Sequence, residues 1–355
     1  MSGWRRILFP FSVVYGAGVW LRNRAFDAGW KRSEEFDLPV ICVGNLEVGG
    51  AGKTPMTEYL VRLLKNKGKT GTLSRGYGRK TKGFILANAR STAAEIGDEP
   101  AQFKRKFPEI TVAVDEDRVH GIRQIKNDLD IIILDDAYQH RAVNAGFNIL
   151  LFDYRSLFHP RFLLPAGNWR DRFSERKRAD VIVVTKCPDQ LSAAEKQGRK
   201  QLLQTRPDQP VFFSSLQYGA LQPLFGPENA SVPDLHNAHL FVLTGIANPE
   251  PLLAYLRQKT PHIYPHSYPD HHTFSAKNIS KLVGELNGMD AAPKYIITTE
   301  KDAQRLQGSK IRDLLKNLPI FVQPVETVFQ DTDGAAFNRL IEHYVTEHSQ
   351  HRRIH

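Results

Sequence analysis

The sequence predicts an α/β fold in which helices flank a mostly parallel sheet, with a second, smaller α/β lobe. Short apolar runs rich in β-branched residues occur at 38–45, 110–115, 130–136, 147–153 and 179–186. Stretches with helical spacing, such as 56–66, separate these runs, and a glycine-rich loop follows the first of them. Continuous apolar strands that alternate with helices are typical of a parallel sheet covered on both faces.

Length and composition limit the class of protein. The chain has 355 residues, which suits two domains, and 41% of them are hydrophobic, as in an ordinary globular protein. Cys42 and Cys187 are the two cysteines, too few for a zinc site or a disulfide framework, so a reducing, cytosolic compartment is expected. The net charge of +10 predicts an anionic partner: nucleic acid, acidic lipid headgroups or a phosphorylated substrate.

Residues 1–30 predict an interfacial membrane helix. An apolar run from Ile7 to Leu21 lies between arginines, and it is shorter than the ~20 residues that a spanning helix needs. Aromatic and basic residues accompany it, as in helices that lie in the plane of a membrane: Trp4, Arg5, Arg6, Phe9, Phe11, Tyr15, Trp20, Arg22 and Arg24. A buried core helix and a secretory signal are the alternatives, although no A-x-A cleavage site follows.

The remaining chain divides into three parts. Residues 31–219 contain the apolar runs and are expected to form a nucleotide-binding domain that ends in a strand at 211–219. A Pro- and Asn-containing connector leads to a second strand–helix set at 239–250, 294–306 and 320–329. We therefore expect a smaller α/β lobe over 220–325, and a C-terminal helix and solvated basic tail over 326–355.

The loop after the first predicted strand, GNLEVGGAGKTP at 44–55, is typical of a phosphate-binding loop. It differs from G-x-x-x-x-G-K-[ST] at Glu47, where the standard pattern has its first glycine. Backbone N–H groups of such a loop, and the helix that follows, attract phosphate. Lys53 would bridge the β- and γ-phosphates and Thr54 would offer a hydroxyl to Mg²⁺. The candidate nucleotide-binding residues are Val48, Gly49, Gly50, Ala51, Gly52, Lys53, Thr54 and Pro55; a glycine turn with a surface lysine is the alternative.

Asp135 and Asp136 end the apolar run 130–136. A carboxylate at the end of a strand beside a phosphate loop is the usual Mg²⁺-binding group of such proteins. An aspartate that merely caps the next helix is the alternative. We expect one of the two carboxylates to bind metal and the other to orient the site.

Polar residues cluster in several further turns. Arg75, Tyr77 and Arg79 lie in a glycine-bracketed turn at 73–80, and Arg170 and Arg172 lie in a Pro-Gly turn at 163–172. Asp98 and Glu99 begin a predicted helix, where acidic residues are favoured in any case. Asp270, His271 and His272 lie in the second lobe, and an Asp–His pair suits acid–base chemistry. The segment 298–306 fits either helix capping or function, and solvated loops remain an alternative for both arginine turns.

Together these motifs resemble the tetraacyldisaccharide 4'-kinase family. The resemblance extends in order from residue 44 to about 303: GN-x-x-VGG-x-GKTP at 44–55, SRGYGR at 74–79, GDEP at 97–100, DD-x-x-QHR at 135–141, LLPAG-x-x-R at 163–170, DHH-x-F at 270–274 and TEKDA at 299–303. The family's loop also lacks the first standard glycine. Its residue at position 47 is usually small and hydroxylated, so Glu47 departs from the family's pattern.

The resemblance implies a P-loop kinase-like fold of two α/β lobes joined by a short β-linker. It implies transfer of the γ-phosphate of ATP to the 4'-hydroxyl of tetraacyldisaccharide 1-phosphate, a lipid-linked sugar, to give lipid IVA. It also implies an N-terminal helix on the cytoplasmic face of the inner membrane.

The same resemblance implies roles for particular residues. Asp98 would be the base, and His271 of the other lobe would pair with it, so catalysis would require lobe closure; His271 is favoured over His272 because it follows Asp270. The remaining expected site residues are Lys53 as a catalytic group, Thr54, Glu99, Asp135 and Asp136 at Mg²⁺, and Tyr77, Arg75 and Arg170 at the substrate.

Two other classes are weighed against this kinase. A P-loop GTPase or ATPase switch, or a metallochaperone-type NTPase, is suggested by VVTKCPD at 183–189, but Asp189 lies one place too late for a guanine-binding loop. A nucleic-acid-binding ATPase would place basic and aromatic residues in one groove, whereas here they cluster in an apolar N-terminal segment. We therefore expect no nucleic-acid partner.

Overall fold

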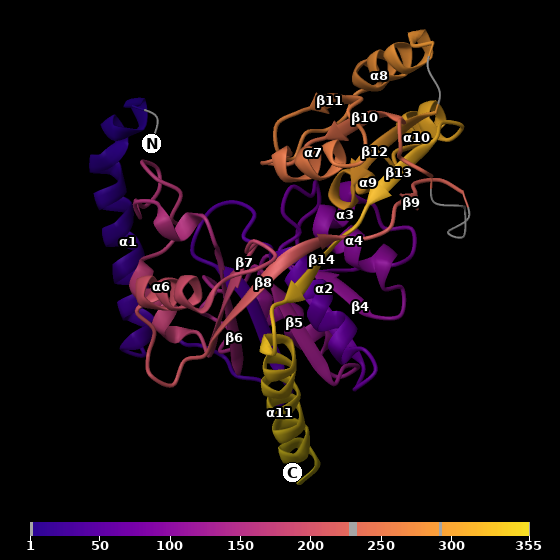
Figure 1. Ribbon diagram of the computed structural model, residues 1–355. Helices are drawn as coiled ribbons and strands as arrows, with labels where there is room; N and C mark the ends of the chain where they lie inside the picture. The colour runs from indigo at the N-terminus through magenta and orange to yellow at the C-terminus, as the bar shows by residue number, and fades with distance from the viewer. Residues whose placement is uncertain (1–2, 227–232, 291–292, 355) are drawn as a thin grey trace.

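The larger of two sheets forms the base of the molecule (Figure 1). The computed structural model describes residues 3–226, 233–290 and 293–354. The sheet has the order β14-β8-β7-β6-β1-β5-β2-β4-β3, and only β3 and β14 run antiparallel to their neighbours. Its strands are β1 Val40–Asn45, β2 Thr70–Ser74, β3 Ile85–Leu86, β4 Thr111–Val114, β5 Ile131–Asp135, β6 Phe147–Asp153, β7 Val181–Thr185, β8 Val211–Tyr218 and β14 Val325–Phe329. The predicted mostly parallel sheet is thus confirmed.

Both faces of this sheet are covered, as the continuous apolar runs predict. In β1, Val40 and Cys42 join one buried cluster, while Ile41 and Val43 join a second on the opposite face. The covering helices are α2 Lys53–Leu64, α3 Ala93–Ile96, α4 Asp98–Lys106, α5 Arg118–Ile125, α6 Ala193–Leu203 and α11 Asp333–Ile354, with the short 3₁₀ helices η2 Ser156–Phe158 and η3 Phe173–Arg178. The chain crosses from one side of β1 to the other between β5 and β6, and ligands bind at such switch points.

A second, smaller sheet lies above the first (Figure 1). Its order is β11-β10-β12-β13-β9, and β9 alone among these strands is antiparallel to its neighbour. Its elements are β9 Gln222–Pro223, β10 His239–Thr244, α7 Glu250–Arg257, β11 Ile263–Ser267, α8 Ala276–Gly288, β12 Lys294–Thr299, α9 Glu300–Arg305, α10 Ser309–Leu315 and β13 Ile320–Gln323. Separate buried clusters on its two faces give this lobe a core of its own.

The run 320–329, expected as one strand of the smaller lobe, is instead two strands in different sheets. Gln323 pairs with β12, whereas Val325 pairs with Tyr218 of β8. Pro324 separates them because a proline has no N–H for a sheet ladder. The antiparallel pair β8–β14 therefore connects the two lobes. We retain the division of the chain at 219/220 and 325/326 as a proposal.

The C-terminal residues return to the larger lobe. Phe337 and Ile341 of α11 are fully buried in the same cluster as the phosphate-loop helix α2. The stretch from 347 onward, expected as a solvated tail, continues α11 as far as Ile354, and side chains from 350 on lie outside the described residues. The helix forms because its apolar side packs on the sheet.

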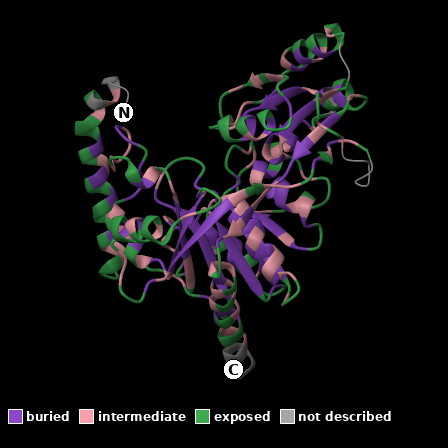
Figure 2. Cartoon of the chain, viewed as in Figure 1, coloured by how far each residue is buried: buried purple, intermediate pink, exposed green. Residues whose placement is uncertain are grey.

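The N-terminal helix has an inverted pattern of burial. The turn η1 Gly3–Leu8 leads into α1 Phe9–Asp27, which lies along the edge of the larger lobe (Figure 1). Its buried residues are small or polar, apart from one valine: Ser12, Gly16, Val19 and Asn23. Much of α1 is coloured as exposed in Figure 2. Large apolar residues of η1 and α1 are among the exposed ones: Ile7, Phe9, Phe11, Val13, Val14, Trp20 and Leu21.

This pattern argues against a buried core helix, because a core helix would turn its apolar side inward. Among the described residues, we find no helix with the length and apolar character needed to cross a membrane. The side chains of Trp4 and Arg6 lie outside the described residues.

Candidate active site

The glycine-rich loop joins the carboxyl end of β1 to α2. The helix begins at Lys53, three residues earlier than the spacing of its apolar residues predicts. Gly52 precedes it with φ of +81°, a left-handed conformation that glycine adopts without a steric cost. Thr185 of β7 donates a hydrogen bond of 2.8 Å from its hydroxyl to the carbonyl of Ala51. The loop is thus tied to the sheet while Val48, Gly49 and Gly50 stay exposed.

The first half of the loop is extended and pairs with the segment around Trp169. The amide of Val48 donates to the carbonyl of Asn168 at 2.7 Å, and the amide of Arg170 donates to the carbonyl of Leu46 at 2.8 Å. An antiparallel bridge between Glu47 and Trp169 lies between these bonds. Such an extended backbone needs no glycine, which explains why the first standard glycine is absent.

The side chain of Glu47 accepts a hydrogen bond of 2.8 Å from the Ser156 hydroxyl. Burial raises the pKa of this carboxyl, and the Ser156 bond only partly offsets that effect. Glu47 therefore joins the loop to the turn η2.

Lys53, Asp136 and Arg170 form a charged cluster beside the loop. The guanidinium of Arg170 binds Asp136 through two hydrogen bonds of 3.0 and 2.7 Å, and the Lys53 ammonium lies 3.7 Å from the same carboxylate. Burial raises the pKa of Asp136, but Lys53 and Arg170 outweigh it and hold the pKa below its usual value. Asp136 has φ of +50°, an uncommon conformation for a residue other than glycine. This aspartate is therefore an anion held between two cations.

Asn45, the last residue of β1, completes this cluster. It is almost fully buried, and its side-chain oxygen accepts a bond of 3.1 Å from Lys53 and a further short one from Arg170. Asn45 is not among the site residues predicted from the sequence. Its position at the end of the strand before the phosphate loop is the signal that could have found it.

Asp135 has a different environment from its neighbour. It accepts a hydrogen bond of 3.1 Å from the hydroxyl of Thr57. Burial raises its pKa to about 7, and the nearby charges of Asp136 and Glu99 raise it further against the effect of Lys53. The carboxylates of Asp136 and Glu99 thus act electrostatically on Asp135.

Within the described ranges, no group of three or more His, Cys, Asp and Glu side chains is arranged to hold a metal ion. Mg²⁺ usually takes one or two protein carboxylates, with water and substrate phosphate as its other ligands, so the residues fit this ion bound together with nucleotide. Thr54 lies beside Lys53 in the first turn of α2.

The GDEP turn places Asp98 at the first position of α4. Gly97 has φ of +94°, and a Cβ at this position would lie 3.0 Å from the backbone of Gly76. A side chain at Gly97 would therefore push the GDEP turn, which carries Asp98, away from the turn at 73–80, which carries Tyr77. Both turns depend on glycine for this close approach.

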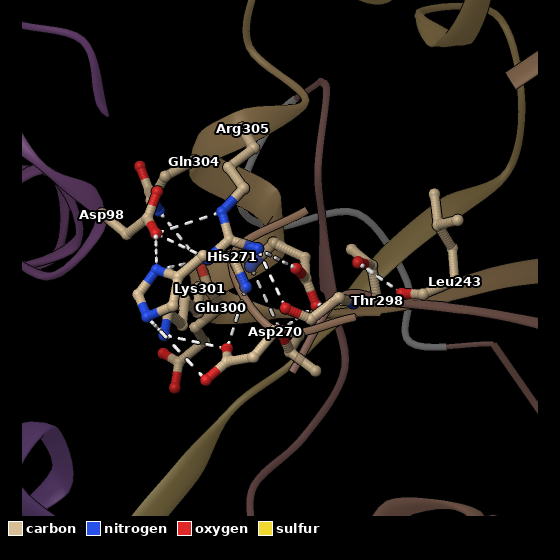
Figure 3. Close-up of polar contacts among 12 residues, drawn as sticks. Asp98, Leu243, Asp270, His271, Thr298, Glu300, Lys301, Gln304 and Arg305 are labelled. Atoms are coloured by element: carbon tan, nitrogen blue, oxygen red, sulfur yellow. Dashed lines mark hydrogen bonds and ion pairs between the residues drawn. The ribbon is translucent and has the colours of Figure 1, made fainter. Parts of the chain in front are cut away.

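Three nitrogen atoms from two side chains of the smaller lobe meet one carboxylate oxygen of Asp98 (Figure 3). Nδ1 of His271 lies 3.2 Å from Oδ2, and Nε and the terminal nitrogen of Arg305 lie at 3.0 and 2.5 Å from it. Burial raises the pKa of Asp98, but hydrogen bonds from His271 and Arg305, with the charge of Lys301, hold it below its usual value. Asp98 is thus ionised at neutral pH.

Lys301 determines the tautomer of His271. Its ammonium lies 3.1 Å from Nε2 of His271, and because an ammonium has only donors, Nε2 must accept. Nδ1 then carries the proton and donates to Asp98. Lys301 also lies 3.4 Å from carboxylate oxygens of Glu99 and Asp270.

His271 and His272 point to different places. His271 has φ of +58°, and its amide donates to the carbonyl of Gly245 at 3.1 Å. His272 turns away: its Nε2 lies 3.1 Å from the side-chain oxygen of Asn278, and its ring stacks on Tyr268 at 4.5 Å. Of the two histidines, His271 alone lies at the lobe interface.

The residues expected at the substrate do not form one cluster. The ring of Tyr77 lies 5.1 Å from that of His271, and it is 67% exposed. Arg75 is exposed on the same turn. Arg170 lies on the other side of the site, beside Asp136.

Arg305 and Lys301 were missed as site residues, although the TEKDA run that precedes Arg305 was noticed. The capping interpretation of this run is confirmed, and the same helix also contacts the candidate site. Thr299 caps α9 by accepting from the amide of Asp302 at 3.1 Å, while Lys301 and Arg305 project from the same helix to Glu99 and Asp98.

A phosphate loop at a switch point, an aspartate pair at the end of the adjacent strand and an Asp–His contact from a second lobe define a P-loop phosphotransferase. A family model described as tetraacyldisaccharide-1-P 4'-kinase matches residues 4–345. The chain belongs to the tetraacyldisaccharide 4'-kinase family.

Individual relatives agree. A tetraacyldisaccharide 4'-kinase of Phocaeicola vulgatus is 43% identical over 97% of this chain and 96% of its own. One of Flavobacterium johnsoniae is 46% identical over 89% and 92%. A crystal structure of LpxK from Aquifex aeolicus in complex with ATP matches with a TM-score of 0.73 and 27% identity, over 96% of this chain and 99% of that one.

These likenesses confirm the predicted family, the P-loop kinase-like fold and the function of a tetraacyldisaccharide 4'-kinase in lipid A synthesis. A nucleotide-driven switch or metallochaperone-type NTPase is not favoured. The roles of individual residues rest on the geometry described above.

Proposed function

We propose that the chain transfers the γ-phosphoryl group of ATP to the 4'-hydroxyl of tetraacyldisaccharide 1-phosphate, with Asp98 as the base and His271 as its partner. The observation that carries this assignment is the distance of 3.2 Å between Nδ1 of His271 and Asp98, which joins two lobes at one carboxylate. A sugar hydroxyl is a weak nucleophile, and a carboxylate within hydrogen-bond reach helps to remove its proton.

On the nucleotide side, residues 48–55 would receive the phosphates. The backbone N–H groups of the loop and the N-terminus of α2 favour an anion there. Lys53 is poised beside Asp136 at 3.7 Å, so its ammonium can exchange this contact for the β- and γ-phosphates. Catalysis by such a site consists mainly of alignment and charge neutralisation.

The residues that would hold Mg²⁺ are Thr54, Glu99, Asp135 and Asp136. The ion supplies neutralisation of the charge that builds on the transferring phosphoryl group. The raised pKa of Asp135, caused by burial beside Asp136 and Glu99, supports a cation at this place, since positive charge would relieve the repulsion.

On the acceptor side, the bonds from His271 and Arg305 fall on Oδ2 of Asp98, so Oδ1 would face the 4'-hydroxyl. The hydroxyl proton passes to this carboxylate as the new bond forms between the sugar oxygen and the γ-phosphorus. The bond from the γ-phosphorus to the β–γ bridging oxygen breaks, and ADP leaves with that oxygen. Tyr77, Arg75 and Arg170 would line the path of the disaccharide and its phosphate, with the guanidinium groups attracting negative charge.

The acceptor's acyl chains stay in a bilayer, so the enzyme must work at its surface. The exposed apolar side chains of α1 suit a helix that lies in the plane of the membrane, and the chain's net charge of +10 suits anionic headgroups. We place the enzyme on the cytoplasmic face of the inner membrane, where ATP is available.

The test incubates purified protein with detergent-solubilised disaccharide 1-phosphate and γ-labelled ATP. The wild type is expected to label the lipid, and Asp98→Ala and Lys53→Ala are expected to label it at least about 10²-fold more slowly. Circular dichroism and binding of an ATP analogue to Asp98→Ala establish that this variant is folded. Unlabelled lipid with folded wild-type protein contradicts the proposal.

A further inference from the structure

The helix α1 is attached to the larger lobe by polar contacts with the segment 162–171. The hydroxyl of Ser12 donates to the carbonyl of Leu163 at 3.0 Å and accepts from the amide of Ala166 at 2.9 Å. Gly16 allows the close approach, since a Cβ there would lie 2.7 Å from Leu163. Both polar groups of a buried backbone turn are thus satisfied by one side chain of the helix.

A second attachment lies further along α1, where Asn23 follows Ser12 by about three turns. Asp171 is fully buried. Its carboxylate accepts a hydrogen bond of 3.0 Å from the side-chain amide of Asn23 and one of 3.3 Å from the guanidinium of Arg22. Tyr15 of the same helix donates 2.9 Å to the carbonyl of Arg170. The two residues next to each other in this segment, Arg170 and Asp171, are therefore both held by α1.

The opposite side of the same segment holds the candidate active site. Its backbone pairs with the first half of the phosphate loop, through the bonds from Val48 to Asn168 and from Arg170 to Leu46. Its arginine binds Asp136 with two hydrogen bonds. The segment is thus a single layer between α1 and the nucleotide site.

We propose that Asn23 and Tyr15 are positioning residues: through the segment 162–171, α1 determines where the Arg170 guanidinium and the first half of the phosphate loop stand. The helix whose outer side faces lipid thereby orients the site on its inner side. The catalytic consequence rests on the proposed function, whereas the structural coupling does not.

Buried polar contacts suit this role better than apolar packing does. An apolar contact tolerates sliding, whereas the paired carboxylate of Asp171 loses its partner if the helix shifts by a fraction of a turn. The contact between Tyr15 and the carbonyl of Arg170 acts on the residue that carries the guanidinium. A shift of about 1 Å in such a group is enough to slow a phosphoryl transfer.

The experiment compares three full-length variants. Asn23→Leu removes the bond to Asp171, Tyr15→Phe removes only the hydroxyl that reaches Arg170, and Leu21→Ser alters the outer side of α1. We expect backbone hydrogen exchange in 162–171 and 46–48 to be about 10-fold faster in Asn23→Leu and about 3-fold faster in Tyr15→Phe, and unchanged in Leu21→Ser. Binding to anionic vesicles should fall only in Leu21→Ser.

Activity supplies a second readout. Asn23→Leu is expected to lower kcat about 10-fold while changing the KM for the lipid less than about 3-fold. Combined with Arg170→Lys, it should add less than a factor of about 2 to the effect of Arg170→Lys alone, because both changes act through one guanidinium.

Two results would overturn the proposal. One is unchanged hydrogen exchange in 162–171 for both Asn23→Leu and Tyr15→Phe. The other is a loss of kcat in the double variant with Arg170→Lys that equals the product of the two single losses. Tyr15→Phe keeps the test meaningful if Asn23→Leu does not fold. If the variants exchange as expected but the wild type labels no lipid, the proposed function is contradicted. The coupling between α1 and the phosphate loop is then still supported.

Discussion

Two Asp–Arg pairs flank the candidate active site, and they differ in which parts of the chain they join. Asp136 and Arg170 both belong to the larger lobe, and Lys53 of the same lobe joins them. Asp98 and Arg305 belong to different lobes, 207 residues apart in the chain. In both pairs, cations outweigh burial and lower the pKa of the aspartate.

The half of the site around Asp136 and Arg170 is preformed within one lobe. The half around Asp98 and Arg305 is assembled from two lobes. The Asp136–Arg170 pair persists in any arrangement of the lobes, so the nucleotide side is complete within one domain. The Asp98–Arg305 pair exists only while the lobes are close, and domains linked by so few strands move relative to each other by default. We therefore propose that the acceptor side is built by closure, which would exclude water from the reacting group.

The largest expected effect comes from breaking the assembled half at its histidine. His271→Gln removes the donor that orients Asp98, and we expect kcat to fall about 10³-fold while binding of an ATP analogue is unchanged. The measurement is the rate of lipid labelling under saturating substrates.

The adjacent residue provides a matched control. His272→Gln alters a histidine that contacts Asn278 and Tyr268 within the smaller lobe, so its rate should stay within about 3-fold of wild type. A larger loss in His272→Gln than in His271→Gln would show that the wrong histidine has been assigned.

The next effect distinguishes the two arginines. Arg305→Gln leaves the nucleotide side intact, so kcat/KM for the lipid should fall about 10²-fold with an unchanged Kd for an ATP analogue. Arg170 binds Asp136 on the nucleotide side and is also proposed to line the path of the disaccharide, so Arg170→Gln should worsen both quantities.

Isothermal titration gives the Kd, and small-angle scattering reports the compactness of the two lobes. Arg305→Gln is expected to increase the radius of gyration, because an ion pair between the lobes is lost, whereas Arg170→Gln should not. If Arg305→Gln weakens nucleotide binding as much as Arg170→Gln does, the site is not divided as described.

The sequence predicts the preformed half far better than the assembled half. The strands around β1 are buried on both faces, so their apolar runs are continuous, and Lys53 and Asp135 follow directly from strand ends and loop spacing. β11 has a mixed pattern of exposure and gives no such signal. The break of 320–329 at Pro324 follows from one missing N–H, a signal that was present but not used.

Contacts between distant segments are where the sequence alone fails. Nothing near Arg305 in the chain indicates that its guanidinium reaches Asp98, because that distance depends on how two lobes pack. The docking side of α1 is similarly hidden: a stripe of Ser12, Gly16 and Asn23 becomes meaningful only once Leu163 and Asp171 lie opposite it. The apolar residues of α1 predict its outer side alone.

The smallest expected effect lies at a third contact between the lobes, away from the reacting groups. Lys106 of α4 lies 2.6 Å from Glu58 of α2 and 2.5 Å from Glu300 of α9, so one ammonium serves two carboxylates. Glu58 is fully buried, and burial together with the charge of Glu300 raises its pKa from 4.5 to about 7 against the effect of Lys106. The single charge of Lys106 therefore cannot neutralise both carboxylates when both are ionised.

This raised pKa predicts the sign of a pH dependence. Between pH 4.5 and 7 the folded chain keeps a proton on Glu58 that the unfolded chain releases, so the free energy of unfolding falls as pH rises through this window. The glutamine of Glu58→Gln cannot ionise, so the variant lacks this loss. Across the window, its free energy of unfolding should rise relative to that of the wild type by on the order of 2 kcal/mol. Urea unfolding at several pH values measures the difference.

Glu326→Gln is the matched control, because Glu326 pairs with the same Arg62 that approaches Glu58 but lies half exposed. An exposed ion pair contributes little, so the control should follow the wild type at every pH. If Glu58→Gln also follows the wild type, the buried triad carries no excess negative charge.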